Sequence, residues 1–253
     1  MTTTTGLPSC THRAEPFLHS AAVTVTTPRS FSQRPYVGPP GSTELWLVRH
    51  GASAASVEGE TFELVEGQGD PPLSEAGRHQ AEQVGLRLAQ EPFDGLYVST
   101  LQRTAQTAAP LVARCGLTPV VDADLREVFL GEWEGGLLRQ KAADGDPLFA
   151  RLMSEQRWDV VPGAESRQVF GGRLRAAVER ITATHPGGRV VVFSHGAAIG
   201  EILAQATESE PFAFVGPDNA SISKIVVSPE RWIIRGYNDT AHLVGAATAE
   251  RAL

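Results

Sequence analysis

Two short apolar segments of this chain are each followed by a tripeptide that contains a histidine and a glycine. Leu45–Val48 runs into Arg49-His50-Gly51, and Val190–Phe193 runs into Ser194-His195-Gly196. Each segment is apolar throughout and contains residues that favour strands, which predicts a strand buried within a parallel sheet. Open α/β sheets bind ligands at the carboxyl ends of their strands. The two histidines are therefore predicted to share one site for an anionic ligand.

Strand-like and helix-like segments alternate along the chain from Glu44 onward. This alternation favours one α/β domain, a three-layer sandwich with a mostly parallel central sheet. Further strands are expected at 95–98, 118–121, 221–227 and 231–237, and helices at 74–90, 166–184 and 197–206. Another helix is expected to begin near Ser99 and to include Cys115.

Side-chain patterns predict where two of these helices begin and which faces they bury. Ser74 is expected to cap the first helix, and Ser99 and Gln102 have the spacing of a capping box for the second. The apolar face of the second helix is expected to follow a helical period, and Cys115 near its end is expected to be buried. The predicted face consists of Leu101, Ala105, Ala108 and Val112.

The first 43 residues differ in composition from the rest of the chain. They are rich in Thr, Ser and Pro, show little periodicity and end near Pro39-Pro40-Gly41. Such a composition buries too little apolar surface to offset the entropy of ordering. Residues 1–43 are predicted to be a disordered tail, and residues 44–253 a single domain.

Composition excludes several classes of partner. The net charge of −7 argues against a general surface for nucleic acid or for an acidic membrane. Apolar stretches are too short to span a membrane, and the N-terminus lacks the pattern of a signal peptide, so a cytoplasmic protein is expected. The two cysteines fit neither a disulfide framework nor a zinc site. The oligomeric state is not readable from the sequence.

Two further charged residues are placed where they could join the histidines. Arg103 follows the strand at 95–98, in the first turn of a helix whose free N–H groups would favour an anion. Glu127 lies in a loop with apolar neighbours, where desolvation would favour its proton-donating form. Glu132 and Glu134 compete with Glu127 for this role, and a structural ion pair between Glu127 and Arg126 is an alternative.

These motifs, in this order, resemble the histidine phosphatase superfamily, which contains the cofactor-dependent phosphoglycerate mutases and a branch of phosphatases. The resemblance extends from about Glu44 to Leu243 and implies a phosphoglycerate mutase-like fold. The motifs that carry it are Arg49-His50-Gly51, Leu101–Thr107, Leu125-Arg126-Glu127, Gly131–Gly135 and Ser194-His195-Gly196.

The resemblance implies a role for each matching residue. His50 is the expected nucleophile, which becomes a phosphohistidine. Arg49, Arg103 and His195 are expected to bind the phosphoryl oxygens, with His195 protonated when phosphate is bound. Glu127 is expected to protonate the leaving oxygen and then to take a proton from water. No metal and no cofactor are implied, and the partner is a small phosphorylated substrate.

Departures from the family pattern favour hydrolysis over isomerisation. Ser56 stands where many members have Asn, and its expected part in phosphate binding is limited by its shorter side chain. The stretch from Glu127 to His195 is shorter than in the mutases and offers no recognised basic residues that would clamp a substrate. The sequence therefore predicts a phosphomonoesterase of the histidine acid type.

Two alternatives stay open at this stage. One is a cofactor-dependent phosphoglycerate mutase, and the other is a weakly active regulatory module that only binds phosphate. Other phosphatase chemistries lack their motifs, since neither cysteine has Arg six residues later and no phosphate-binding Gly-rich loop with Lys is present. The substrate is not indicated, although the segments 57–70 and 136–163 are expected to shape specificity.

Overall fold

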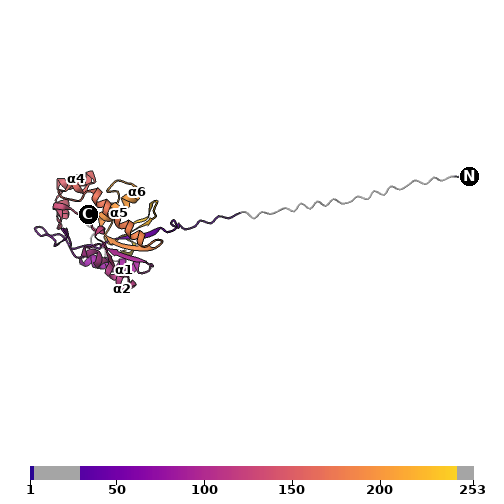
Figure 1. The fold of residues 1–253 in the computed structure, drawn as a ribbon, viewed down its shortest axis with the longest axis horizontal. Coiled ribbons are helices and arrows are strands. Elements are labelled where there is room, and N and C mark those ends of the chain that lie inside the picture. The colour runs from indigo at the N-terminus through magenta and orange to yellow at the C-terminus, as the bar shows by residue number, and fades with distance from the viewer. Residues whose placement is uncertain (3–28, 244–253) are drawn as a thin grey trace. The chain divides into compact units, whose positions relative to one another are not determined.

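A six-stranded sheet forms the centre of the computed structural model, which describes residues 1–2 and 29–243 (Figure 1). Four adjacent strands pair in parallel, and the fifth strand in the spatial order is antiparallel to both of its neighbours. The sheet is therefore mostly parallel, as predicted. Its strands, in spatial order, are β5 (Val120–Val121), β4 (Gly95–Val98), β6 (Arg189–Ser194), β1 (Thr43–Arg49), β7 (Ile222–Val227) and β8 (Trp232–Asp239).

Helices cover both faces of this sheet and complete three layers. Helices α1 (Glu75–Leu88) and α2 (Gln102–Cys115) pack on one face, and α5 (Arg167–Thr184) and α6 (Gly196–Thr207) on the other (Figure 1). Successive residues of β1 and β6 point to opposite faces, so both strands are apolar on each side. The predicted three-layer α/β fold is confirmed.

The sequence predicts the N-terminus of α1 correctly and that of α2 wrongly. The Ser74 hydroxyl accepts a hydrogen bond from the Gly77 N–H at 3.1 Å and caps α1. Helix α2 begins at Gln102, and its Gln102 N–H donates to the Asp70 carboxylate at 2.9 Å. The capping box fails because Ser99 lies before the helix and its hydroxyl contacts other groups. A residue distant in sequence provides the cap instead.

The buried face of α2 also differs from the predicted one. Ala105 is exposed and Cys115 is an exposed free thiol, although both were expected to be buried. The inner face carries polar side chains, which an apolar period cannot reveal. The buried residues are Arg103, Thr104, Thr107, Ala108 and Leu111.

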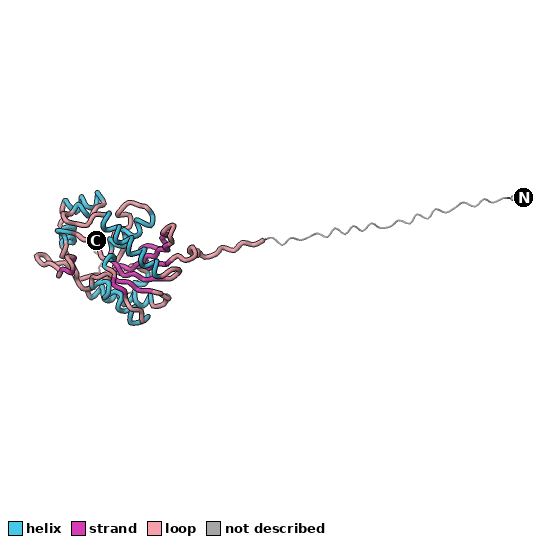
Figure 2. Tube along the Cα trace, viewed as in Figure 1, coloured by secondary structure: helices cyan, strands magenta, loops and turns pink. Residues whose placement is uncertain are grey.

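The two segments expected to shape specificity have their own secondary structure. Segment 57–70 contains a hairpin of β2 (Leu64–Val65) and β3 (Gln68–Gly69). Segment 136–163 contains α3 (Leu137–Ala143) and α4 (Pro147–Glu155), drawn as short helices in Figure 2. Trp133, Leu152 and Val161 form a small apolar core beneath them. Four 3-10 helices complete the elements: Ala123–Leu125, Gly131–Trp133, Trp158–Val160 and Ala241–Leu243.

The predicted tail lies mostly outside the described residues. The chain divides into a segment Met1–Val37 and a unit that begins at Gly38, and the first strand among the described residues begins at Thr43. The disorder expected over residues 1–43 stays a prediction, because residues 3–28 are not described. Across the described ranges, none of the helices has the length and apolar character that crossing a membrane requires.

Candidate active site

The two motif histidines lie side by side at the carboxyl edge of the sheet. Strands β1 and β6 are parallel neighbours in which Arg49 pairs with Ser194, so the next residue of each chain segment is a histidine. The imidazole rings of His50 and His195 have centroids 5.2 Å apart and planes inclined at 62°. His50 is 6% exposed and His195 is fully buried.

His50 is oriented so that one ring nitrogen is free to react. Its Nδ1 lies 2.7 Å from the carbonyl oxygen of Gly51, which can only accept a hydrogen bond. Nδ1 therefore carries the proton of the neutral ring, and Nε2 carries the lone pair. The His50 carbonyl accepts from the Asn219 amide at 3.0 Å, which ties this turn to the segment before β7.

The electrostatic surroundings keep His50 neutral. Burial lowers the pKa of His50 well below that of an ordinary histidine, and the neighbouring positive charges of Arg103 and Arg49 lower it further. The hydrogen bond to Gly51 acts in the opposite direction but does not offset burial. A neutral imidazole with an available Nε2 lone pair is the form that acts as a nucleophile.

The loop after His50 is fixed by a close approach of α1. A Cβ atom on Gly77 would lie 1.9 Å from the carbonyl oxygen of Ala52, so only glycine fits there. The same carbonyl accepts hydrogen bonds from the Ser74 backbone and hydroxyl, and the Ala52 N–H donates to Gln80. The N-terminus of α1 thus holds the turn that carries the nucleophile.

Two arginines contribute buried positive charge to the site. Arg103 lies in the first turn of α2, where it donates to the Gly69 carbonyl at 3.0 Å and lies 3.6 Å from the Asp70 carboxylate. Arg49 donates from Nη1 to the carbonyl of Pro217, and its buried Nε has no hydrogen-bond partner among the described residues. Burial lowers the pKa of both guanidinium groups. Donors left free in this way are suited to an anionic ligand.

Glu127 is held at the N-terminus of α6. Its carboxylate accepts hydrogen bonds from the backbone N–H groups of Ala197 and Ala198, both at 3.1 Å, and of Val128 at 3.0 Å. The first N–H groups of a helix lack partners within it, so a carboxylate is well placed there. The ion pair of Glu127 with Arg126 that was considered is not formed, since Arg126 pairs with Glu66.

Arg173 of α5 positions the loop that carries Glu127, and the sequence did not single it out. Its guanidinium donates to the backbone carbonyls of Asp124, Arg126 and Glu127 at 2.7–2.8 Å. It also forms an ion pair with Glu165 at 2.8 Å. One partly buried cation therefore holds three carbonyl groups within residues 124–127, the segment that carries the carboxylate.

Arg49, His50, Arg103 and Glu127 line one pocket, which neither the buried His195 nor Ser56 lines. Ser56 instead contacts Gly136 and α3. Its hydroxyl donates to the Gly136 carbonyl at 3.2 Å and accepts from the Gln140 amide at 2.8 Å. Ser56 does not line the pocket around His50. Its contacts tie the loop after β1 to α3, which gives no support to direct contact with phosphate.

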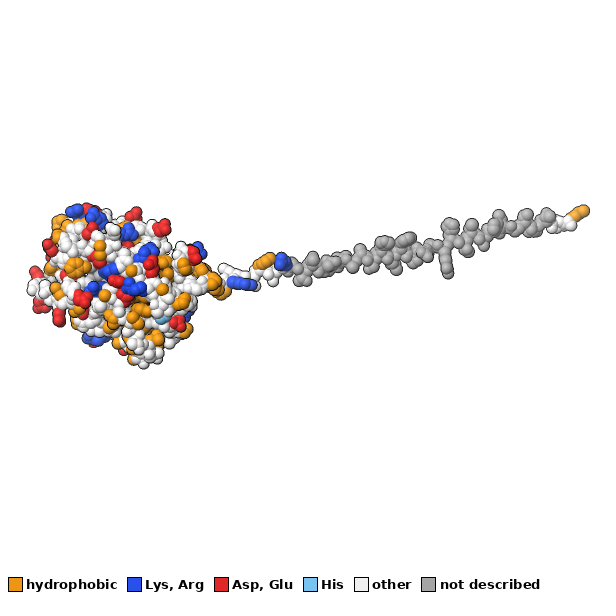
Figure 3. All heavy atoms as spheres, viewed as in Figure 1, with side chains coloured by type: hydrophobic (Ala, Val, Ile, Leu, Met, Phe, Trp, Pro, Cys, Tyr) orange, Lys and Arg blue, Asp and Glu red, His pale blue; other side chains and the backbone are white. Residues whose placement is uncertain are grey.

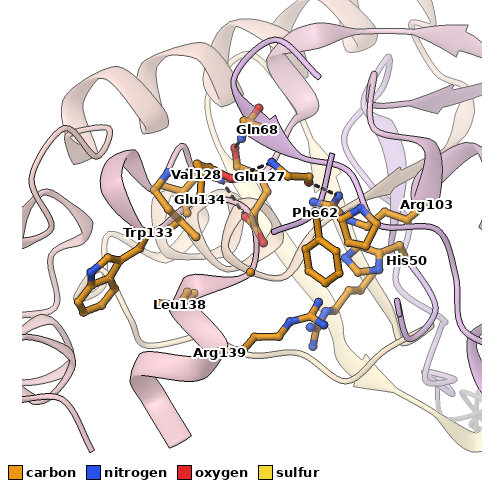
Figure 4. A pocket seen from close by; sticks show the side chains of 15 residues that line it. His50, Phe62, Gln68, Arg103, Glu127, Val128, Trp133, Glu134, Leu138 and Arg139 are labelled. Carbon is orange, nitrogen blue, oxygen red and sulfur yellow. Dashed lines mark hydrogen bonds between the residues drawn. The ribbon is translucent and has the colours of Figure 1, made fainter. Parts of the chain in front are cut away.

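A pocket opens beside His50, Arg49, Arg103 and Glu127 (Figure 4). Its volume is about 180 Å³, which is below the roughly 300–1,000 Å³ typical of sites for drug-sized ligands. This size suits a small molecule. The outer walls come from the two segments expected to shape specificity and from residues 128–133. The apolar residues that line these walls are Phe62, Val128, Leu130, Trp133 and Leu138.

Two further charged residues line the pocket: Arg139, which the sequence analysis did not single out, and Glu134, which it considered as an alternative acid to Glu127. Arg139 extends from α3 toward His50 in Figure 4 and donates to the Ala54 carbonyl at 2.9 Å and the Ser53 hydroxyl at 2.7 Å. The pKa of Glu134 is raised by burial, although its carboxylate accepts from the Gly69 and Leu130 N–H groups. Arg139 lies within the stretch that was expected to lack a substrate-facing cation, and only tertiary folding places it at the site.

Comparison with known proteins gives a consistent result. A family model for the histidine phosphatase superfamily (branch 1) matches residues 45–240. The phosphoglycerate mutase-like protein 4 of Arabidopsis thaliana is 32% identical, over 79% of this chain and 86% of that protein. A metal-independent phosphoserine phosphatase of the same plant is 29% identical, over 83% and 87%. A mycobacterial glucosyl-3-phosphoglycerate phosphatase has a similar structure, with a TM-score of 0.67, 29% identity, and coverage of 79% and 100%.

Acid is expected to destabilise the protein through its two site histidines. Burial lowers the pKa of His50 and of His195 well below the ordinary value. From about pH 6.5 downward the unfolded chain binds protons at these rings that the folded protein does not, so stability falls with pH. We expect the Tm from scanning calorimetry to fall between about pH 7.5 and about pH 5.5, and to fall less steeply in His50→Gln/His195→Gln. Equal slopes in the two proteins would contradict this account.

Proposed function

This chain belongs to the histidine phosphatase superfamily, and we propose that it is a metal-independent phosphomonoesterase whose nucleophile is His50. The proposal rests chiefly on one observation: the His50 Nδ1 proton is directed to the Gly51 carbonyl, so the Nε2 lone pair is free beside two arginines and a carboxyl group. Relatives of this chain are described both as phosphatases and as mutase-like proteins.

The first half of the proposed reaction transfers the phosphoryl group from the substrate to His50. The Nε2 lone pair forms a bond to phosphorus while the bond from phosphorus to the ester oxygen breaks. Glu127 gives its proton to that oxygen, and the alcohol leaves. The products of this step are a phosphohistidine, an ionised Glu127 and the free alcohol.

The second half regenerates the enzyme with water. Glu127 takes a proton from a water molecule as the water oxygen attacks phosphorus, and the bond between phosphorus and Nε2 breaks. Inorganic phosphate is released and Glu127 is protonated again. The same carboxyl group serves both halves, because its backbone donors at the start of α6 hold it in one position.

Fixed positive charge supports both steps. The phosphoryl group passes through a metaphosphate-like transition state with charge on three equatorial oxygens. Arg49, Arg103 and His195 are proposed to contact these oxygens, as the family resemblance implies. The buried guanidinium groups act in a low-dielectric site, where they stabilise such charge more strongly than they would in water.

A phosphate ester of a small metabolite is the proposed substrate. The pocket is small, and two of the relatives described above are named as phosphatases, which supports hydrolysis. A phosphoglycerate mutase is the second candidate, because another relative carries that description. We expect phosphate release from a panel of small phosphate esters, and no interconversion of 3- and 2-phosphoglycerate with or without 2,3-bisphosphoglycerate. Isomerisation faster than hydrolysis would favour the mutase.

Replacing the nucleophile tests the covalent intermediate. In wild type, a ³²P-labelled ester is expected to leave an acid-labile label on the protein, and in His50→Ala the label and phosphate release are both lost. The loss should be at least about 10³-fold, since no other group supplies the covalent route. His79→Ala is the matched control, because His79 is exposed on α1. Undiminished turnover in His50→Ala would exclude the mechanism.

Replacing the acid tests its role by the leaving group. Glu127→Gln keeps the shape of the side chain but cannot donate a carboxyl proton. We expect phosphate release to fall by about 10²–10⁴-fold for alkyl esters, which need protonation, and far less for nitrophenyl esters. Glu132→Gln is the control, since Glu132 is exposed and lies outside the pocket. An equal loss for both kinds of ester would reject Glu127 as the acid.

A further inference from the structure

His195 has one nitrogen in a hydrogen-bonded chain and one nitrogen with no partner. Its Nε2 lies 2.8 Å from the Ser99 hydroxyl, and both residues are buried. Its Nδ1 is also buried and makes no hydrogen bond within the described part of the protein. A buried polar atom without a partner is unfavourable and requires an explanation, and in an active site a bound ligand provides one.

Only one assignment of donors and acceptors satisfies all the hydrogen bonds around Ser99. The Thr104 hydroxyl lies 2.9 Å from the Leu101 carbonyl and 3.2 Å from the Ser99 carbonyl, and both carbonyls can only accept. Thr104 therefore donates its one hydrogen to a carbonyl and accepts from the Ser99 hydroxyl at 3.1 Å. The Ser99 oxygen then has no hydrogen left for His195.

It follows that His195 is the donor toward Ser99. The Nε2–H of His195 donates to the Ser99 oxygen, which also accepts from the Leu101 N–H at 3.2 Å. In the neutral ring the second nitrogen, Nδ1, carries the lone pair. The tautomer of His195 is thus set by Ser99 and Thr104, which lie on the sequence segment that also carries Arg103.

We propose that Ser99 is a positioning residue, which orients His195 so that Nδ1 takes up a proton and donates it to a phosphoryl oxygen when phosphate binds. This inference rests on the proposed function. The acceptor at Nε2 stabilises the imidazolium cation more than the neutral ring, because a hydrogen bond to a charged group is stronger than one between neutral groups. Ser99 therefore promotes the protonation that binding requires.

The surrounding charges explain why the proton arrives only with the anion. Four basic residues surround His195. They are Arg49 at the end of β1, His50 directly after it, Arg103 of α2 and Arg173 of α5. Burial lowers the pKa of His195, and these neighbouring charges lower it further. The neutral ring is therefore favoured before phosphate binds. A phosphate dianion beside the ring reverses this balance, since an adjacent opposite charge favours the protonated form.

The tautomer can be measured without any activity. Nitrogen-15 NMR of the histidine rings, with His195 assigned by comparison with His195→Asn, is expected to show the Nε2–H tautomer before phosphate addition. Saturating inorganic phosphate should convert the same ring to the doubly protonated form. A ring that carries its proton on Nδ1 before binding, or that stays neutral with phosphate bound, would overturn the proposal.

Variants of the chain test its effect on binding. In Ser99→Ala, phosphate affinity from calorimetry should fall about tenfold or more, and the pH above which phosphate binding weakens should move downward by about one unit. Thr104→Val should shift that pH in the same direction, and Thr104→Ser should restore it. Thr100→Val is the matched control, because the neighbouring Thr100 hydroxyl has no partner in the described chain.

The outcomes separate this inference from the proposed function. If Ser99→Ala lowers the Tm but leaves the pH dependence of phosphate binding unchanged, Ser99 is only structural and the inference is wrong. If wild type neither binds inorganic phosphate nor releases it from any ester, the proposed function itself fails. The tautomer measured before phosphate addition still decides the direction of the Ser99 chain in that case.

Discussion

The parallel pairing of β1 with β6 is the constraint on which the site depends. The register that places Arg49 opposite Ser194 also places His50 and His195 at the same edge of the sheet. A shift of one strand by one residue would turn its side chains to the opposite faces of the sheet and change the spacing of the two rings. Helices cover both faces of these strands, so that shift would move side chains that belong to one layer of the core into the other layer. The hydrophobic core therefore fixes the distance between the two imidazoles.

Burial of the cations gives the site its chemical character. Arg49 and Arg103 lie next to two rings whose pKa values are lowered, chiefly by burial and further by the neighbouring positive charges. The Asp70 carboxylate beside Arg103 balances part of this charge. Placing like charges together in a buried site is unfavourable in the empty protein, and a dianion relieves it. Under the proposed function, the stability given up in assembling the pocket contributes to the affinity for phosphate.

The sequence predicted the parts of the fold that depend on local patterns. Buried strands, the Ser74 cap and the long helix after Ser166 were found because apolar period and capping residues are local signals. The start of α2 was missed because its cap, Asp70, comes from another segment. Arg139 and Arg173 were missed for the same reason, since only tertiary structure brings a guanidinium from α3 or α5 to the site. The structure brings the motif histidines and arginines together, because strand ends converge at one sheet edge, and their roles in catalysis stay proposals.

The sheet edge carries the groups proposed to react with the phosphate ester, whereas the hairpin segment and α3 are expected to select the substrate. The groups proposed to handle phosphorus come from β1, α2, the start of α6 and the Glu127 loop, all of which the three-layer core holds in place. The outer wall comes from the hairpin segment and α3, where Arg139 lies over the Phe62 ring at 5.8 Å and is tied to the loop after β1. Helix α3 has no fully buried residue, so its position depends on such contacts rather than on a core. Changes in this wall can therefore alter the leaving group that is accepted without disturbing the nucleophile.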